Sequence, residues 1–264
     1  MGVINVTPDS FSDGGRHLVP AHALAAGERM LADGAHILDV GGESTRPGAE
    51  PVALAEELAR VMPVIEALHE ACPEALVSID TSKPEVMRAA VAAGAGMIND
   101  VTALAAPGAL ETAAALGVPV CLMHMQGEPR TMQREPRYAD VVAEVREFLL
   151  ARARACLAAG IARERIVIDP GFGFGKTVAH NLTLLARLSE LADTGYEVLV
   201  GLSRKSMIGT LLGRPVDQRA TASAALALLA VQQGASIVRV HDVAETADVL
   251  GLAQRVEDAR GGGI

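Results

Sequence analysis

The chain has 264 residues and a mass of 27.3 kDa, half of its residues are hydrophobic, and its formal net charge is −9. This composition supplies a sizeable buried core and excludes a disordered chain. The 23 basic residues are outnumbered by 32 acidic ones, and only 2% of the residues are aromatic. Nucleic-acid binding, which needs a basic surface and aromatic rings that stack on bases, is therefore excluded.

The sequence also lacks the segments that are typical of membrane or secreted proteins. The longest apolar run, Ala220 to Val231, is shorter than the roughly 18 residues of a membrane span. No basic segment followed by an apolar stretch opens the chain, and three isolated cysteines lie in apolar surroundings at Cys72, Cys121 and Cys156. We therefore predict a cytoplasmic protein with reduced thiols and without a membrane or nucleic-acid partner.

A repeated pattern predicts the secondary structure. Stretches rich in Ala, Leu, Glu and Arg end in Gly, and a short run of β-branched residues follows within a few positions. Gly fits the left-handed conformation that ends a helix, and continuous apolar runs are typical of strands in a parallel sheet buried on both faces. In chain order, the expected strands lie near 2–6, 37–41, 76–80, 96–100, 118–124, 166–170, 197–203 and 236–241. The expected helices lie near 21–33, 52–71, 84–93, 108–116, 138–159, 180–193, 217–233 and 243–258.

These elements form eight strand–helix units in one domain, residues 1–264, and 264/8 is 33 residues per unit. Strands and helices that alternate at this spacing indicate right-handed crossovers, and eight such units predict an α/β protein with a closed (β/α)8 TIM barrel. An open doubly wound sheet is the alternative. The glycine pattern of a dinucleotide site does not follow the first predicted strand, which leads into Thr7-Pro8-Asp9-Ser10.

Polar residues follow the predicted strands, and in a barrel of this type the site lies where the strands end. Arg239 and His241 are two positions apart on a strand and point to the same side, so with Arg46 and Lys205 they predict an anion site. The remaining polar set matches a flat, nitrogen-rich ring with several N–H donors, and consists of Asp80, Asn99 and Asp169.

The same polar residues also allow less specific interpretations than a ligand pocket. Any one strand end can be a helix cap or a turn, for which Asp100 and Asp242 are the best candidates. A mutual salt-bridge network, for example Asp169 with Lys205, is the alternative for the charged set. The stretch 171–177 resembles a phosphate-binding loop, but its glycine spacing fits neither the Walker nor the dinucleotide pattern.

Two expected loops, Thr7 to Pro20 and Glu43 to Pro51, are long for a barrel and rich in Gly, Ser, Asp and Pro. Loops of this length predict lids or binding loops, and the isolated aromatic residue Phe11 favours a binding role for the first.

At these residues the sequence resembles the dihydropteroate synthases of bacterial folate synthesis, which belong to the pterin-binding enzymes. The similar blocks span almost the whole chain and are GVINVTPDSFSDGG (2–15), LDVGGESTRPG (38–48), SIDTSKP (78–84), INDV (98–101), LMHMQG (122–127), DPGFGFGK (169–176), GLSRKS (201–206) and RVHDV (239–243).

The resemblance implies a (β/α)8 barrel that condenses 6-hydroxymethyl-7,8-dihydropterin pyrophosphate with 4-aminobenzoate, is a target of sulfonamides and forms a homodimer. It implies that the pterin is held by Asp80, Asn99, Asp169 and Lys205, in a pocket lined by Met123 and Phe174. It implies that the pyrophosphate is contacted by Thr45, Arg46, Arg239 and His241, and that the aminobenzoate lies beside Phe11, Pro47 and Ser206. Asn5 is implied to help hold the cofactor Mg²⁺.

The implied mechanism begins with cleavage of the pterin C–O bond, which leaves a cation delocalised into the ring. Mg²⁺ and the basic residues stabilise the departing pyrophosphate, the carboxylates of Asp80 and Asp169 favour the electron-poor ring, and the aniline nitrogen then attacks. Two alternatives stay open. One is a pterin barrel of the methyltetrahydrofolate methyltransferase kind, which does not need the phosphate set. The other is a paralogue that binds a pterin without turnover.

Overall fold

A computed structural model of the chain describes residues 1–6, 18–44, 48–127 and 131–260. Its strands are β1 (Gly2–Asn5), β2 (Ile37–Gly41), β3 (Leu76–Asp80), β4 (Met97–Asp100), β5 (Val120–Met123), β6 (Ile166–Asp169), β7 (Glu197–Val200) and β8 (Ile237–Val238). Its α-helices are α1 (Leu18–Ala32), α2 (Leu54–Ala71), α3 (Pro84–Ala92), α4 (Ala109–Leu116), α5 (Val141–Ala158), α6 (Val178–Ala186), α7 (Ser189–Ala192), α8 (Ser206–Leu212), α9 (Ala220–Gln232) and α10 (Val243–Arg260).

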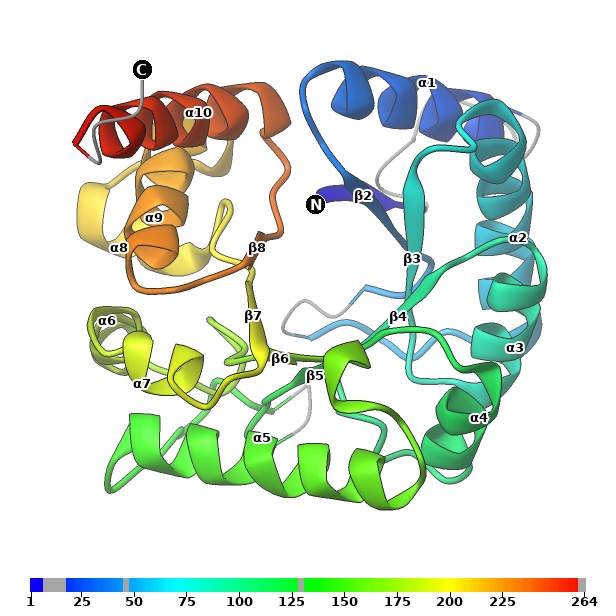
Figure 1. Cartoon of the computed structure of the whole chain (residues 1–264), viewed down its shortest axis with the longest axis horizontal. Coiled ribbons are helices and arrows are strands. Elements are labelled where there is room, and N and C mark those ends of the chain that lie inside the picture. Colours follow the sequence, from blue (N-terminus) through cyan, green and yellow to red (C-terminus); the bar gives the residue numbers. More distant parts are fainter. Residues whose placement is uncertain (7–17, 45–47, 128–130, 261–264) are drawn as a thin grey trace.

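The eight strands form one parallel sheet in the order β1 to β8. The sheet closes where the chain beyond β8 meets β1: Val3 N–H donates to Val240 O at 3.1 Å, and Val240 N–H donates to Met1 O at 2.9 Å. Figure 1 shows the strands as an inner ring and the helices as an outer ring around them. The closed (β/α)8 barrel is therefore confirmed, and the open doubly wound alternative is excluded.

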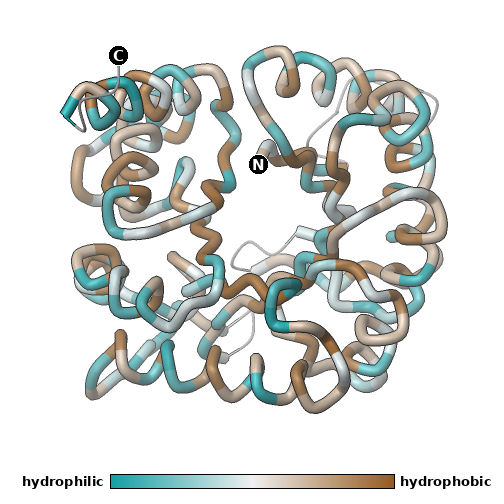
Figure 2. The backbone as a smooth tube through the Cα atoms, viewed as in Figure 1, coloured by the Kyte–Doolittle hydropathy of each residue, from teal (hydrophilic) through white to brown (hydrophobic). Residues whose placement is uncertain are grey.

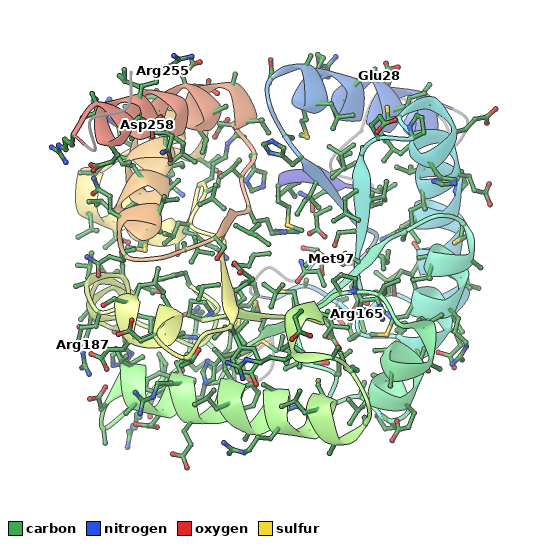
Figure 3. The ribbon with its side chains drawn as sticks, in the orientation of Figure 1. Glu28, Met97, Arg165, Arg187, Arg255 and Asp258 are labelled. Carbon is green, nitrogen blue, oxygen red and sulfur yellow. The ribbon has the colours of Figure 1, made fainter. Side chains whose placement is uncertain are left out.

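Alternation of side chains along each strand separates two apolar regions. The outward-facing residues, such as Leu38, Ile98 and Leu122, are buried between the strands and the helices. Inside the barrel, a smaller cluster gathers Met1, Met97, Cys121, Val167 and Leu199. Figure 2 shows the hydrophobic colouring along the strands, and Figure 3 places Met97 beside the inner ring. The inside of the barrel is therefore apolar at the end where the strands begin, which leaves the other end for polar groups.

The helices differ from the expected ones in two places. The expected helix at 180–193 is split at Arg187, whose φ of −116° and ψ of 25° are not helical. Helix α8, which was not expected, lies before α9 and ends at Gly213, in the left-handed region at φ 66°. Its short sequence carries an internal glycine, Gly209, which hides it from a search for helical periodicity. Within the described ranges, no helix is both long and apolar enough to cross a bilayer.

Candidate active site

An arginine between two carboxylates occupies the polar end of the barrel. The Nε of Arg239 donates to Oδ2 of Asp39 at 2.6 Å, and its Nη2 donates to Oδ2 of Asp80 at 2.9 Å. The amide of Asn99 also donates to Asp39 Oδ2, at 3.1 Å. These contacts join β2, β3, β4 and the segment after β8 across the interior, and they bring three of the predicted site residues together.

The electrostatics of this group follow from its burial. Burial raises the pKa of Asp80 to about 7; the Arg239 guanidinium acts in the opposite direction, and the negative charge of Asp39 adds to the rise. Burial alone would lower the pKa of Arg239, but the paired carboxylates raise it. Asp39 is fully buried, and among the described residues its Oδ1 and the Oγ of Ser78 have no hydrogen-bond partner. The barrel interior therefore carries polar atoms that a ligand or a water molecule can satisfy.

A second carboxylate with its own set of cations lies at the end of β6. Burial raises the pKa of Asp169 to about 6, while the Gly171 N–H bond at 2.7 Å and the charges of Lys205 and Lys176 act to lower it. Burial lowers the pKa of Lys205 to about 8, and Asp169 opposes that change. The Lys205 ammonium lies 4.2 Å from the centroid of the Phe174 ring, a cation–π distance.

The salt-bridge alternative applies to only one of the two carboxylates. Asp80 is ion-paired with Arg239, whereas no ion pair joins Asp169 to Lys205 among the described residues. Asp169 thus remains available to a ligand that offers N–H donors.

His241 is held as a neutral ring by Ser203. The backbone N–H of His241 donates to Ser203 Oγ at 3.2 Å, and the same oxygen lies 3.1 Å from Nδ1 of the ring. Because Oγ already accepts one hydrogen bond, its hydroxyl hydrogen can point to Nδ1, which leaves Nε2–H as a donor. Burial lowers the pKa of His241 to about 4, and the charges of Arg239 and Arg204 lower it further. A neutral N–H donor beside Arg239 suits a phosphate oxygen.

Two of the polar residues have structural roles: Asp100 forms the predicted turn, whereas the Asp242 side chain forms an ion pair instead of the predicted cap or turn. The Asp100 carboxylate accepts the backbone N–H groups of Thr102 at 2.7 Å and Leu104 at 2.9 Å, which stabilises the turn after β4. Asp242 accepts the Nε of Arg204 at 3.0 Å and so fixes the segment before α10 to the loop after β7.

The other predicted residues that the structure describes surround this mouth. Asn5 ends β1, and Met123 at the end of β5 is buried opposite Asp169 in the strand register. A cavity lies beside Phe174's loop and the start of α8, and its lining includes Gly173, Lys176, Lys205, Ser206 and Met207. Four predicted residues, Phe11, Thr45, Arg46 and Pro47, lie outside the described residues.

Sequence reasoning missed Asp39 as a member of the site. The signal was present, because Asp39 is a charged residue in the middle of the apolar strand Ile37–Gly41. Its position two residues before Gly41 places it on the inward face, one layer below the mouth.

A charged cluster at the start of the second long loop was also missed. Lys83 donates to Glu43 and, at 2.5 Å, to Glu57, a fully buried residue of α2. The Thr81 hydroxyl donates to the other oxygen of Glu57 at 2.6 Å, and Val52 N–H donates to Glu43 at 3.3 Å. The cluster therefore connects both ends of the loop, at 43 and 52, to α2 and to the residue that follows Asp80.

The comparison with known proteins agrees with this geometry. A closed (β/α)8 barrel whose mouth combines carboxylates, an amide and cations belongs to the class of small-molecule enzymes of this fold. Residues 1–241 match the model of the family described as pterin binding enzyme.

Relatives and solved structures are similar over nearly the whole chain. Dihydropteroate synthase of Haemophilus influenzae is 54% identical over 98% of this chain and 94% of that protein. The structure of Xanthomonas albilineans dihydropteroate synthase with 4-aminobenzoic acid has a TM-score of 0.92 and 56% identity, covering 97% of this chain and 92% of that one. That of the Yersinia pestis enzyme with a sulfonamide drug complex has a TM-score of 0.93 and 51% identity, covering 98% and 94%. The chain therefore belongs to the pterin-binding enzymes and, within them, to the dihydropteroate synthase family.

We predict that Lys83→Met lowers the free energy of unfolding. The change leaves the buried Glu57 carboxylate without its cation, which costs about 3 kcal/mol for a well-buried pair. The measurement is the urea midpoint, with Lys83→Met combined with Glu57→Gln as the control that removes the unpaired charge. The double variant should recover part of the loss; a single variant as stable as the parent protein would contradict the proposed role of the pair.

Proposed function

We propose that this chain is an active dihydropteroate synthase, which joins 6-hydroxymethyl-7,8-dihydropterin pyrophosphate to 4-aminobenzoate and releases pyrophosphate. The observation that carries the proposal is that two sets of charged and polar groups, one suited to a ring with N–H donors and one suited to a phosphate, lie at one barrel mouth. Asp169 and Lys205 form one side, and Arg239 and His241 form the other. A methyltransferase-type pterin barrel has no need of the second set.

In this proposal the pterin ring lies between Asp169 and the group of Asp80 and Asn99. Asp169 accepts ring N–H groups, because its carboxylate has protein cations near it but no ion pair. Lys205, cationic at neutral pH with a pKa of about 8, donates to a ring acceptor. The buried side chain of Met123 and the ring of Phe174, which contacts the Lys205 ammonium, provide apolar surfaces for the ring.

The pyrophosphate lies toward the end of β8. Nε and Nη2 of Arg239 hold Asp39 and Asp80, which leaves its Nη1 as the proposed phosphate donor, and the neutral ring of His241 offers its Nε2–H. Thr45 and Arg46 of the second long loop are proposed to complete this side. The carboxylates and the leaving group thus share one arginine, which couples the ring half of the pocket to its phosphate half.

Asn5 is the residue proposed to help hold Mg²⁺. It supplies one amide oxygen at the end of β1, and its register partner Gly41 lies against the Asp80 carboxylate. Among the described residues no group of three His, Cys, Asp or Glu could hold a metal ion by itself. These residues fit a hard cation that binds chiefly through substrate phosphates, where it supplies additional charge to the departing pyrophosphate.

The aminobenzoate is proposed to enter beside Ser206, with Phe11 and Pro47 from the two long loops. Ser206 begins α8, directly after Lys205, and both line the cavity at the mouth. Cleavage of the pterin C–O bond places positive charge on the ring, which the nearby carboxylates stabilise, and negative charge on the pyrophosphate, which Arg239 and His241 stabilise. The aniline nitrogen then attacks the ring-bound carbon and loses a proton, so no covalent bond to the protein is needed.

The first prediction from the proposed function concerns turnover. Purified protein should release pyrophosphate only when the pterin pyrophosphate and 4-aminobenzoate are both present, and sulfonamides should compete with 4-aminobenzoate. A pyrophosphate-release assay with each substrate omitted in turn is the measurement. Binding of the pterin without pyrophosphate release would favour the non-catalytic paralogue instead.

The second prediction separates the two halves of the pocket. Asp169→Asn presents an amide donor to ring donors and should weaken both hydroxymethylpterin and its pyrophosphate by about 2 kcal/mol or more. His241→Ala removes a phosphate donor and should weaken only the pyrophosphate. The measurement is the affinity of each variant for hydroxymethylpterin and for its pyrophosphate, determined by calorimetry. His241 is the better phosphate variant, since Arg239→Ala would also leave Asp39 buried without its ion pair.

The third prediction concerns the metal. Turnover should require Mg²⁺, whereas the protein without substrate should bind little of it, because Asn5 is a single neutral ligand. Equilibrium dialysis of the free protein and assays in excess chelator are the measurements. Full activity in chelator would contradict the role of Asn5.

The fourth prediction concerns a homodimer through the outer surface of α9 and α10. Helix α9 is apolar along nearly its whole length, and Leu229 on α9 and Leu252 on α10 are 49% and 67% exposed. Helices α9 and α10 pack side by side (Figure 1). Light scattering should show that Leu229→Glu with Leu252→Glu gives a monomer, while Leu157→Glu on α5 leaves the dimer intact.

A further inference from the structure

Lys176 is a buried lysine that the proposed chemistry does not use. Its side chain is in the loop between β6 and α6, the residue is 3% exposed, and no carboxylate lies within ion-pair distance of it among the described residues. Its Nζ lies 2.9 Å from His124 Nδ1, 2.9 Å from Gly171 O and 3.0 Å from Phe174 O. A fourth acceptor, His124 O, lies further away at 3.4 Å, so the three close acceptors match the three N–H donors of an ammonium group. Burying such a charge without a counter-ion is costly, so the arrangement requires an explanation.

The contacts of Lys176 fix the two residues that hold Asp169. Gly171, whose carbonyl accepts from Lys176, donates its N–H to Asp169 Oδ1 at 2.7 Å. His124, whose ring accepts from Lys176, donates its backbone N–H to Asp169 O at 2.9 Å. Gly171 has a φ of 66°, and a Cβ there would lie 2.0 Å from His124 O, so only glycine permits this close approach. Lys176 thus joins the loop to β5 around Asp169.

The charges around Asp169 point to a second effect. Three cations face it: Lys176 from its own loop, Lys205 from the loop after β7 and Arg239 from the segment after β8. Arg239 is already paired with Asp39 and Asp80, so the charges of the two lysines remain to stabilise Asp169. Lys176 itself faces His124, Asp169 and Lys205; burial lowers its pKa to about 7, so it is mostly protonated at the pH where Asp169 titrates, near 6.

We propose that Lys176 is a positioning residue for Asp169, which orients the Gly171 N–H toward the carboxylate and supplies the charge that keeps it ionised for binding of the pterin ring. The proposal rests on the proposed function, because it requires Asp169 to bind the ring. Its ligand class is therefore that of Asp169, a heterocycle with adjacent N–H donors, and its effect appears as the pH dependence of that binding.

The test is the affinity of the full chain for hydroxymethylpterin, measured by calorimetry between pH 5 and 8. In the parent protein affinity should fall as the pH drops through about 6, because a neutral Asp169 accepts less well. In Lys176→Met the fall should begin about one pH unit higher, as expected when a carboxyl loses a nearby cation. Lys176→Gln keeps a donor for the carbonyl groups but has no charge, so it should shift the dependence of affinity on pH in the same way. This variant replaces Lys176→Met in the test if Lys176→Met does not fold.

Asn181 offers the matched control. Its Oδ1 accepts Gly173 N–H at 2.8 Å and its Nδ2 donates to Thr177 O at 2.7 Å, so it braces the same loop without a charge. Asn181→Ala should weaken binding at every pH and leave the midpoint where it is. An unshifted midpoint in both Lys176 variants, or an equal shift in Asn181→Ala, would overturn the proposal. Asp169→Asn should abolish the fall in affinity at low pH. If this variant binds the pterin like the parent protein, Asp169 does not bind the ring, and the proposed function of this residue is wrong independently of Lys176.

Discussion

The site depends on the cost of placing charged groups inside an apolar barrel. Asp39 is fully buried, and removing its ion pair with Arg239 would leave a buried carboxylate without its counter-ion, which is strongly destabilising. Arg239 satisfies it, and the same guanidinium reaches Asp80. The position of the Asp80 carboxylate, which we propose binds the ring, is thus tied to an ion pair one layer deeper, and the polarity of the mouth depends on the order of the interior below it.

The same constraint explains why several cations serve two purposes. Arg239 neutralises the interior carboxylates and is also proposed to bind the phosphate. Lys205 is near Asp169 and over the Phe174 ring. In each case a cation that we propose binds the ligand also interacts with groups of the folded protein, so the pocket is organised in advance for a charged substrate. This pre-organisation limits how freely either cation can be replaced.

Much of the fold and part of the site could be predicted from the sequence. The strand runs and the glycines after the helices predicted all eight strands and the barrel, because these signals are local. The structure brings Asp80, Asn99 and Arg239 together, as a pocket at the strand ends requires. His124, for which the sequence predicted no role, follows Met123 and therefore faces outward, where its ring contacts Lys176 and Phe148. The roles of Lys176 and Glu57 could not be predicted, because the His124 ring that contacts Lys176 and the Thr81 and Lys83 side chains that contact Glu57 come from other units, and no local pattern specifies them.

Closure of the barrel makes the order of assembly matter. The seam between β1 and the segment after β8 joins the two ends of a chain of 264 residues, and the Arg239–Asp39 pair spans 200 positions. Contacts this distant in sequence form late, because a long loop must be closed before they add any stability. Asn5 and His241 lie on the two sides of that seam, so the proposed phosphate half of the pocket is assembled only when the last unit meets the first. A partly folded chain can thus contain every one of the middle strands and still have no place for its charged substrate.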